Sequence, residues 1–202
     1  LLRPLESGAD LVLHSATKYL SGHNDLIAGA VSGEQTLIDA LKEAQALLGS
    51  IISPHTAFLL DRGMKTLALR MERQSETALR LAEYLSGVKE VECVHYPGLP
   101  SHPDHETARR YMKAFGALVS FEMRGGPDAA DRLVDELRVP ILAAGFGGTE
   151  SQAEHHAKMA FADLGLEGAK ARGVTPGLIR FAVGIEDYEV LREDMKRAFQ
   201  KI

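Results

Sequence analysis

The stretch Gly8-Ala-Asp-Leu-Val-Leu-His-Ser-Ala-Thr-Lys-Tyr-Leu-Ser-Gly-His-Asn-Asp25 begins with a short apolar run, residues 10–14, and continues as a polar segment with one lysine. A second apolar run follows at residues 26–31. Both runs are too short for helices and are typical of buried strands. The polar segment between them is longer than most connections between strands, which indicates that it has a function of its own.

Lys18 is the residue of this segment best suited to chemistry, and Ser15 and Thr17 stand beside it. A lysine amine that loses water in such a loop can attack a carbonyl and form an imine. Two hydroxyls within three residues can donate hydrogen bonds to a phosphate. A surface lysine in a polar turn explains the spacing equally well, because Ser-x-Thr-Lys is short and common.

Outward from this segment, helical and strand patterns alternate, which predicts an α/β fold in two unequal parts. Apolar spacing predicts helices at 35–48, from Ser53-Pro54 onward until Gly63 interrupts, and at 65–85, 105–113, 129–137 and 186–199. Further strands are expected at 91–95, 117–123, 140–144 and 178–183. We expect residues 1–70 to form the end of one domain with a linking helix, and residues 71–202 to form a smaller α/β domain.

The composition excludes several classes of protein. A net charge of −5 argues against a nucleic-acid protein held by a broad basic surface. No apolar run approaches the roughly 18 residues that a membrane-spanning helix needs. Cys93 is the single cysteine, which excludes an internal disulfide and suits a reducing cytoplasm, and we expect it to be a small core residue. The eight histidines show no ligand pattern with Cys or carboxylate support, so no metal site is expected.

Arg180 stands in an otherwise apolar predicted strand, residues 178–183. A guanidinium cannot lose its charge on burial, so Arg180 needs an anionic partner. A carboxylate of the chain, such as Glu150 or Asp187, is one candidate.

The lysine segment resembles that of the Cys/Met-metabolism family of pyridoxal-phosphate enzymes, whose pattern reads G-A-D-x-V-x-H-S-x-T-K-Y-x-x-G-H-S-D. Asn24 in place of the usual Ser is the only departure. Four more stretches match the family in order: Ser53–Leu67, Val94–Leu99, Phe146–Ser151 and Gly177–Asp187. The resemblance therefore extends over essentially the whole chain.

This resemblance implies a fold-type I enzyme: a large cofactor domain with a mixed sheet, a smaller C-terminal α/β domain, and a homotetramer built from dimers. Lys18 would bind pyridoxal 5'-phosphate covalently and move protons, and Ser15 and Thr17 would donate to the cofactor phosphate. Arg180 would clamp the substrate α-carboxylate, a role that suits guanidinium geometry, with a main-chain contact from Gly145. The upstream half of the cofactor domain would precede Leu1, so we expect this chain alone to be inactive or nearly so.

The implied activity is a cytoplasmic step of trans-sulfuration in methionine and cysteine metabolism, and so of amino-acid biosynthesis. A cystathionine γ-synthase-like γ-replacement on an activated homoserine ester is the first hypothesis, and a methionine γ-lyase-like or cystathionine γ-lyase-like elimination is the second. Ala144 stands where family members acting on cystathionine commonly carry Glu, whereas Phe146–Ser151 is closer to the plant-like γ-synthases. A rival from another class is an inactive fragment or assembly module that lacks the upstream half of the cofactor site.

Overall fold

The computed structural model describes all residues, 1–202, and its largest element is a five-stranded sheet. The strand order is β3-β4-β7-β6-β5, and every neighbouring pair is antiparallel except β5 with β6. The strands are β3 (Val91–His95), β4 (Leu118–Met123), β5 (Ile141–Leu142), β6 (Gln152–His155) and β7 (Leu178–Ala182). Four of the five were predicted from the sequence; β6 was not.

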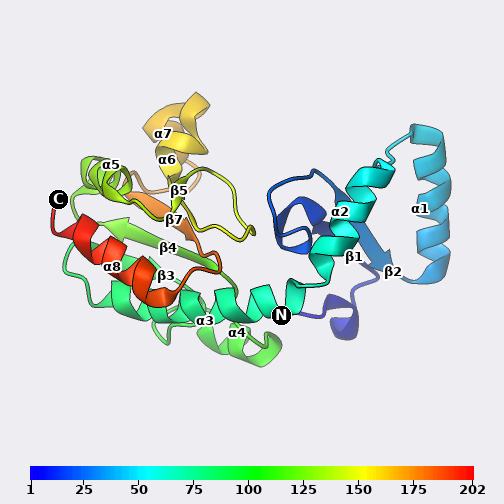
Figure 1. Ribbon diagram of the computed structural model, residues 1–202, viewed down its shortest axis with the longest axis horizontal. Helices are drawn as coiled ribbons and strands as arrows, with labels where there is room; N and C mark the ends of the chain where they lie inside the picture. Colours follow the sequence, from blue (N-terminus) through cyan, green and yellow to red (C-terminus); the bar gives the residue numbers. More distant parts are fainter.

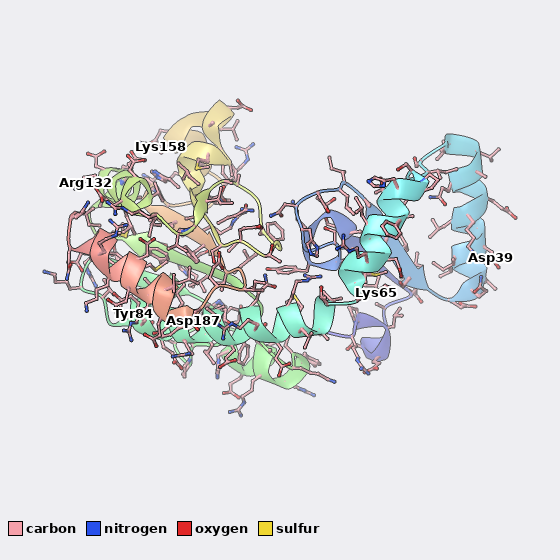
Figure 2. The ribbon with its side chains drawn as sticks, viewed as in Figure 1. Asp39, Lys65, Tyr84, Arg132, Lys158 and Asp187 are labelled. Atoms are coloured by element: carbon pink, nitrogen blue, oxygen red, sulfur yellow. The ribbon has the colours of Figure 1, made fainter.

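Three helices cover one face of this sheet (Figure 1): α3 (Leu67–Ser86), α5 (Gly126–Glu136) and α8 (Tyr188–Phe199). Side chains alternate between faces along a strand, so β7 sends Ile179 and Phe181 into the core that these helices share with the sheet, and Arg180 to the opposite face. Asp187 caps α8 and lies beside α3, where its carboxylate accepts from Arg73 at 3.2 Å (Figure 2). Arg180 therefore lies on the face of the sheet opposite these helices, where the neighbouring strand β6 is also buried.

The first third of the chain has almost no core of its own. It contains the short helix η1 (Pro4–Ser7), β1 (Leu11–Ser15), β2 (Gly29–Gly33), α1 (Gln35–Leu48) and α2 (Pro54–Met64). The strands were predicted to be buried, and this is wrong for the chain as described: β1 and β2 form a two-stranded sheet without a buried residue, and Leu13 is 74% exposed. No residue of α1 is buried, although its apolar spacing predicted the helix correctly.

Local signals explain the start of α2. Ser53 accepts a hydrogen bond from the backbone N–H of Thr56 at 3.1 Å, and Pro54 occupies the first turn, as the sequence predicted. Gly63, expected to interrupt the helix, lies inside α2 instead. It has no Cβ, and this lets α2 approach the carbonyl of Ser21, which a Cβ at that position would strike.

Two segments connect the first third of the chain with the part that contains the five-stranded sheet. Helix α3 runs from the end of α2 onto the five-stranded sheet, and the loop between β5 and β6 reaches toward the segment that follows β1 (Figure 1). Three short helices after β6 and one after β3 complete the fold: α6 (His156–Met159), η3 (Ala162–Leu164), α7 (Gly165–Lys170) and α4 (His105–Tyr111). None of the helices is long and apolar enough to cross a membrane. The domain boundary near residue 70 stays a prediction.

Candidate active site

Lys18 lies in a π-helical turn, η2 (Ala16–Leu20), where the sequence predicted only a polar loop. The backbone leaves helical geometry at Lys18 itself (φ −94°, ψ −124°). Its side chain lines a cavity of about 600 Å³, within the usual size range of ligand sites. The other lining residues are Thr17, Asn24, Asp25, Leu26, Ile27, His55, Thr56, Leu59, Gly145 and Phe146.

The two hydroxyls beside Lys18 differ in their surroundings. The Thr17 hydroxyl accepts from the backbone N–H of Ala28 at 3.0 Å and donates to the Ala28 carbonyl at 3.3 Å. Ser15 is exposed and its hydroxyl makes no hydrogen bond within the chain. Ser15 is therefore free to donate to a ligand, whereas Thr17 would first have to turn its proton away from Ala28. Their role at a phosphate stays a prediction.

Arg180 approaches the Lys18 site from β7, on the face of the sheet opposite α3, α5 and α8. Its Nη2 donates to the carbonyls of Ala144 at 2.8 Å and Gly145 at 3.2 Å, and its Nε lies 3.0 Å from a carboxylate oxygen of Glu154. The anionic partner within the chain is thus Glu154. Glu150 is exposed and makes no ion pair, and Asp187 binds Arg73, so both partners suggested from the sequence are wrong. Only the carbonyl of Gly145, not its N–H, faces the guanidinium.

Phe146 brings the two cations together. The Lys18 Nζ lies 4.8 Å from the centroid of its ring, and the Arg180 Cζ lies 5.3 Å from the same centroid. The two groups are therefore no farther apart than the sum of these distances. Lys18 and Arg180, which are 162 positions apart in the sequence, share one site.

Close packing between two loops fixes this arrangement. A Cβ on Gly147 would meet the backbone of Lys18 and Tyr19, and one on Gly148 would strike the Asn24 side chain. Gly147 has φ +88°, which favours glycine. Asn24 has φ +55°, a conformation that asparagine tolerates better than most residues.

Tyr19 packs beside Phe146 at the same site. Its ring lies 5.9 Å from that of Phe146, centroid to centroid. Burial raises the pKa of Tyr19 to about 12, while the charge of Arg180 acts in the opposite direction. Tyr19 is therefore protonated at neutral pH.

Arg70 holds the lysine segment against α2 and α3, and no pattern in the sequence predicted this role. The residue is only 5% exposed, and its guanidinium donates to the carbonyls of Tyr19 and Gly63, each at 2.9 Å, and to the Thr66 hydroxyl at 3.1 Å. Gly22 packs directly on the guanidinium. No carboxylate compensates the charge, and burial lowers the pKa of Arg70 below its ordinary value. Arg70 thus ties the turn of Lys18 to α2 and α3.

Cys93 is exposed, not a core residue as expected. It lies on β3, the edge strand of the sheet, just after an irregularity in the register between Val91 and Cys93. The expectation rested on the usual burial of cysteine, whereas the edge strand leaves this position open to solvent.

Comparison with known proteins identifies the family. The family model described as Cys/Met metabolism PLP-dependent enzyme matches residues 1–200. The chain belongs to this family. It is 44% identical to cystathionine gamma-synthase 1, chloroplastic, of Arabidopsis thaliana, over 99% of this chain and 36% of that one. It is 46% identical to an L-methionine gamma-lyase of Pseudomonas deceptionensis, over 99% of this chain and 51% of that one.

Solved structures agree. A cystathionine gamma synthase from Xanthomonas oryzae pv. oryzae, in complex with cystathionine, superposes with a TM-score of 0.94 at 42% identity, over 100% of this chain and 52% of that one. The predicted family and the α/β fold are confirmed. The chain spans about half or less of the length of these relatives, so the activity, substrates and partners of a whole protein are proposals here.

The described residues fit a part of the family's cofactor site. They supply the Lys18 amine and the Thr17 side chain, which line a cavity of about 600 Å³, and near them in the chain the Ser15 hydroxyl, which has no internal partner and is not among the lining residues. An aldehyde and a phosphate are the groups that such an amine and hydroxyl would bind.

Proposed function

We propose that this chain forms part of a pyridoxal-phosphate-dependent enzyme that carries out γ-replacement on an activated homoserine ester, as a cystathionine γ-synthase does. The observation that supports the proposal is that Lys18 and Arg180 both lie close to the Phe146 ring, 4.8 Å and 5.3 Å from its centroid. An amine that can bind an aldehyde and a guanidinium that can bind a carboxylate stand within one amino acid's reach of each other.

Pyridoxal phosphate, when bound, supplies the electron sink for carbanion chemistry at the substrate. The Lys18 Nζ would bind the cofactor aldehyde and, once released, would accept and return protons at the substrate carbons. Nη2 of Arg180 donates to two carbonyls and Nε faces Glu154, whereas Nη1 has no protein partner. Nη1 would therefore receive the α-carboxylate, and the Ser15 hydroxyl the phosphate.

An elimination of the methionine γ-lyase kind is the second candidate. A relative with that activity in its name is 46% identical to this chain, against 44% for the γ-synthase of Arabidopsis thaliana. Ala144 supports this alternative as well, because it offers no side-chain carboxylate for a second amino group of cystathionine.

Product analysis distinguishes the two reactions. The product of the complete reading frame, loaded with pyridoxal phosphate, is incubated with L-methionine alone and, separately, with an O-acylhomoserine plus cysteine. Cystathionine formed in the second mixture, with little 2-oxobutanoate from methionine, is expected. Rapid release of 2-oxobutanoate from methionine would contradict the γ-synthase proposal and favour the lyase.

The oligomeric state belongs to the same proposal. We propose a homotetramer built from dimers, in the cytoplasm, and sedimentation velocity of the complete gene product measures its mass. The rival proposal, a catalytically inactive assembly module, predicts a stable oligomer that never attaches pyridoxal phosphate to Lys18. Borohydride reduction in the presence of the cofactor, followed by peptide mapping, separates these two outcomes.

A further inference from the structure

Glu154 is the direct cross-strand neighbour of Arg180 on the face of the sheet opposite α3, α5 and α8. β6 and β7 run antiparallel, and their register places Glu154 opposite Arg180. The Glu154 side chain is only 1% exposed, and its Oε1 lies 3.0 Å from the Arg180 Nε. A carboxylate so deeply buried needs a charged partner, and opposite charges across two strands attract.

His156 gives the same carboxylate a second partner. Its Nδ1 lies 2.6 Å from Oε1 of Glu154, and its ring packs edge-on against Phe161. The other oxygen, Oε2, is buried and receives no hydrogen bond. The Nε–H of Arg180 is also buried and, despite the short distance to Oε1, points along no hydrogen bond. Oε2 of Glu154 thus lacks a donor and the Nε–H of Arg180 lacks an acceptor, and the two groups face each other. A small rotation of the carboxylate would bring them into a hydrogen bond.

The contacts of Arg180 divide its guanidinium into two parts. Nε faces Glu154, and Nη2 is held by the carbonyls of Ala144 and Gly145, whereas Nη1 has no protein partner. The carbonyls alone leave the guanidinium free to pivot about Nη2, because they hold a single nitrogen. A second anchor at Nε fixes the plane and with it the direction of Nη1.

We infer that Glu154, oriented by His156, is the positioning residue that directs the free edge of Arg180 toward the substrate α-carboxylate. The inference rests on the proposed function in one respect, namely that Arg180 binds that carboxylate. Glu154 acts through Arg180 and touches no substrate atom. Its loss should therefore weaken the binding of carboxylate ligands and leave the turnover of bound substrate nearly unchanged.

A pair of ligands isolates this effect. L-Norleucine carries an α-carboxylate but no γ-leaving group, and L-norleucinamide differs only at the carboxylate. The dissociation constants of both are measured by calorimetry on the complete gene product loaded with pyridoxal phosphate. We expect the wild type to prefer norleucine, and Glu154→Gln, which removes the charge at constant volume, to lower this preference about tenfold. The matched control is Glu150→Gln, which changes an exposed carboxylate on the neighbouring loop and should leave the preference unchanged.

A double-mutant cycle tests whether Glu154 acts through Arg180. In an Arg180→Lys background, Glu154→Gln should cause no further loss of preference. The inference is overturned if the wild type does not prefer norleucine, if Glu154→Gln lowers the urea midpoint without changing the preference, or if its effect persists without Arg180. Glu154→Gln carries the test even where Glu154→Ala fails to fold. Borohydride labelling of Lys18 reports separately on the proposed function, so a failure of one can be told from a failure of the other.

Discussion

Replacement of Arg70 by methionine should release the turn that carries Lys18. Methionine fills much of the same space but cannot donate, so the carbonyl of Tyr19 loses its hydrogen bond, whereas the carbonyl of Gly63 keeps those from the backbone N–H and the hydroxyl of Thr66. A buried carbonyl left unpaired costs about 1–3 kcal/mol. Removal of an uncompensated buried cation offsets a part of this, and we expect a net destabilisation of about 1–2 kcal/mol.

Amide hydrogen exchange measures this loss at the segment itself. The N–H groups of Ser21 and Gly22 donate to the carbonyls of Ala16 and Lys18, and they are protected only while the turn is formed. In Arg70→Met both amides should exchange about tenfold faster, the equivalent of about 1.4 kcal/mol.

The control for this experiment is Arg124→Met, which also removes a guanidinium bonded to a backbone carbonyl, but at the surface. Its effect on unfolding should stay within about 0.5 kcal/mol. Unchanged exchange at Ser21 and Gly22 in Arg70→Met would refute the idea that Arg70 holds the lysine turn.

Three further changes test other parts of the structure. Gly63→Ala should destabilise the contact between α2 and the lysine segment, because the new Cβ meets the backbone oxygen of Ser21; an unchanged urea midpoint would speak against that packing. Burial raises the pKa of Asp194, but the hydrogen bonds from Arg197 and two backbone N–H groups together lower it by more, so the pKa lies below its ordinary value of 3.8. The stability that this carboxylate contributes is complete above pH 3.8 and is lost as the pH falls through the folded-state pKa. Asp194→Asn should therefore make the urea midpoint fall less steeply with decreasing pH. An equally steep fall would contradict this. Lys18→Ala should abolish turnover while sedimentation velocity finds the oligomer intact, and retained turnover would exclude Lys18 from catalysis.

Helix ends and repeating apolar positions could be predicted from the sequence, because these signals are local. The helix at 35–48 and the Ser53 cap are cases in which neighbouring residues decide the outcome. β6 was missed because Gln152-Ala-Glu-His155 is short and its inward side chains are polar as well as apolar. Its pairing with β7 on one side and β5 on the other makes it a strand.

The site could be predicted in part. Lys18 stood out because it lies in a long polar segment beside two hydroxyls, and Arg180 because it is a cation in an apolar strand. The partner of Arg180 depends on strand register, which places Glu154 beside it although Asp187 is nearer in the sequence. Arg70 was missed for a similar reason, since its acceptors are backbone carbonyls, which leave no mark in a sequence.

Reduction with borohydride tests the central claim most directly. The complete gene product is mixed with pyridoxal 5'-phosphate, reduced, digested and mapped by mass spectrometry, with Lys18→Ala as the control. A pyridoxyl group on Lys18, absent from the other lysines of the chain, is the predicted result. Modification spread over the exposed lysines, with Lys18 left unlabelled, would contradict the account.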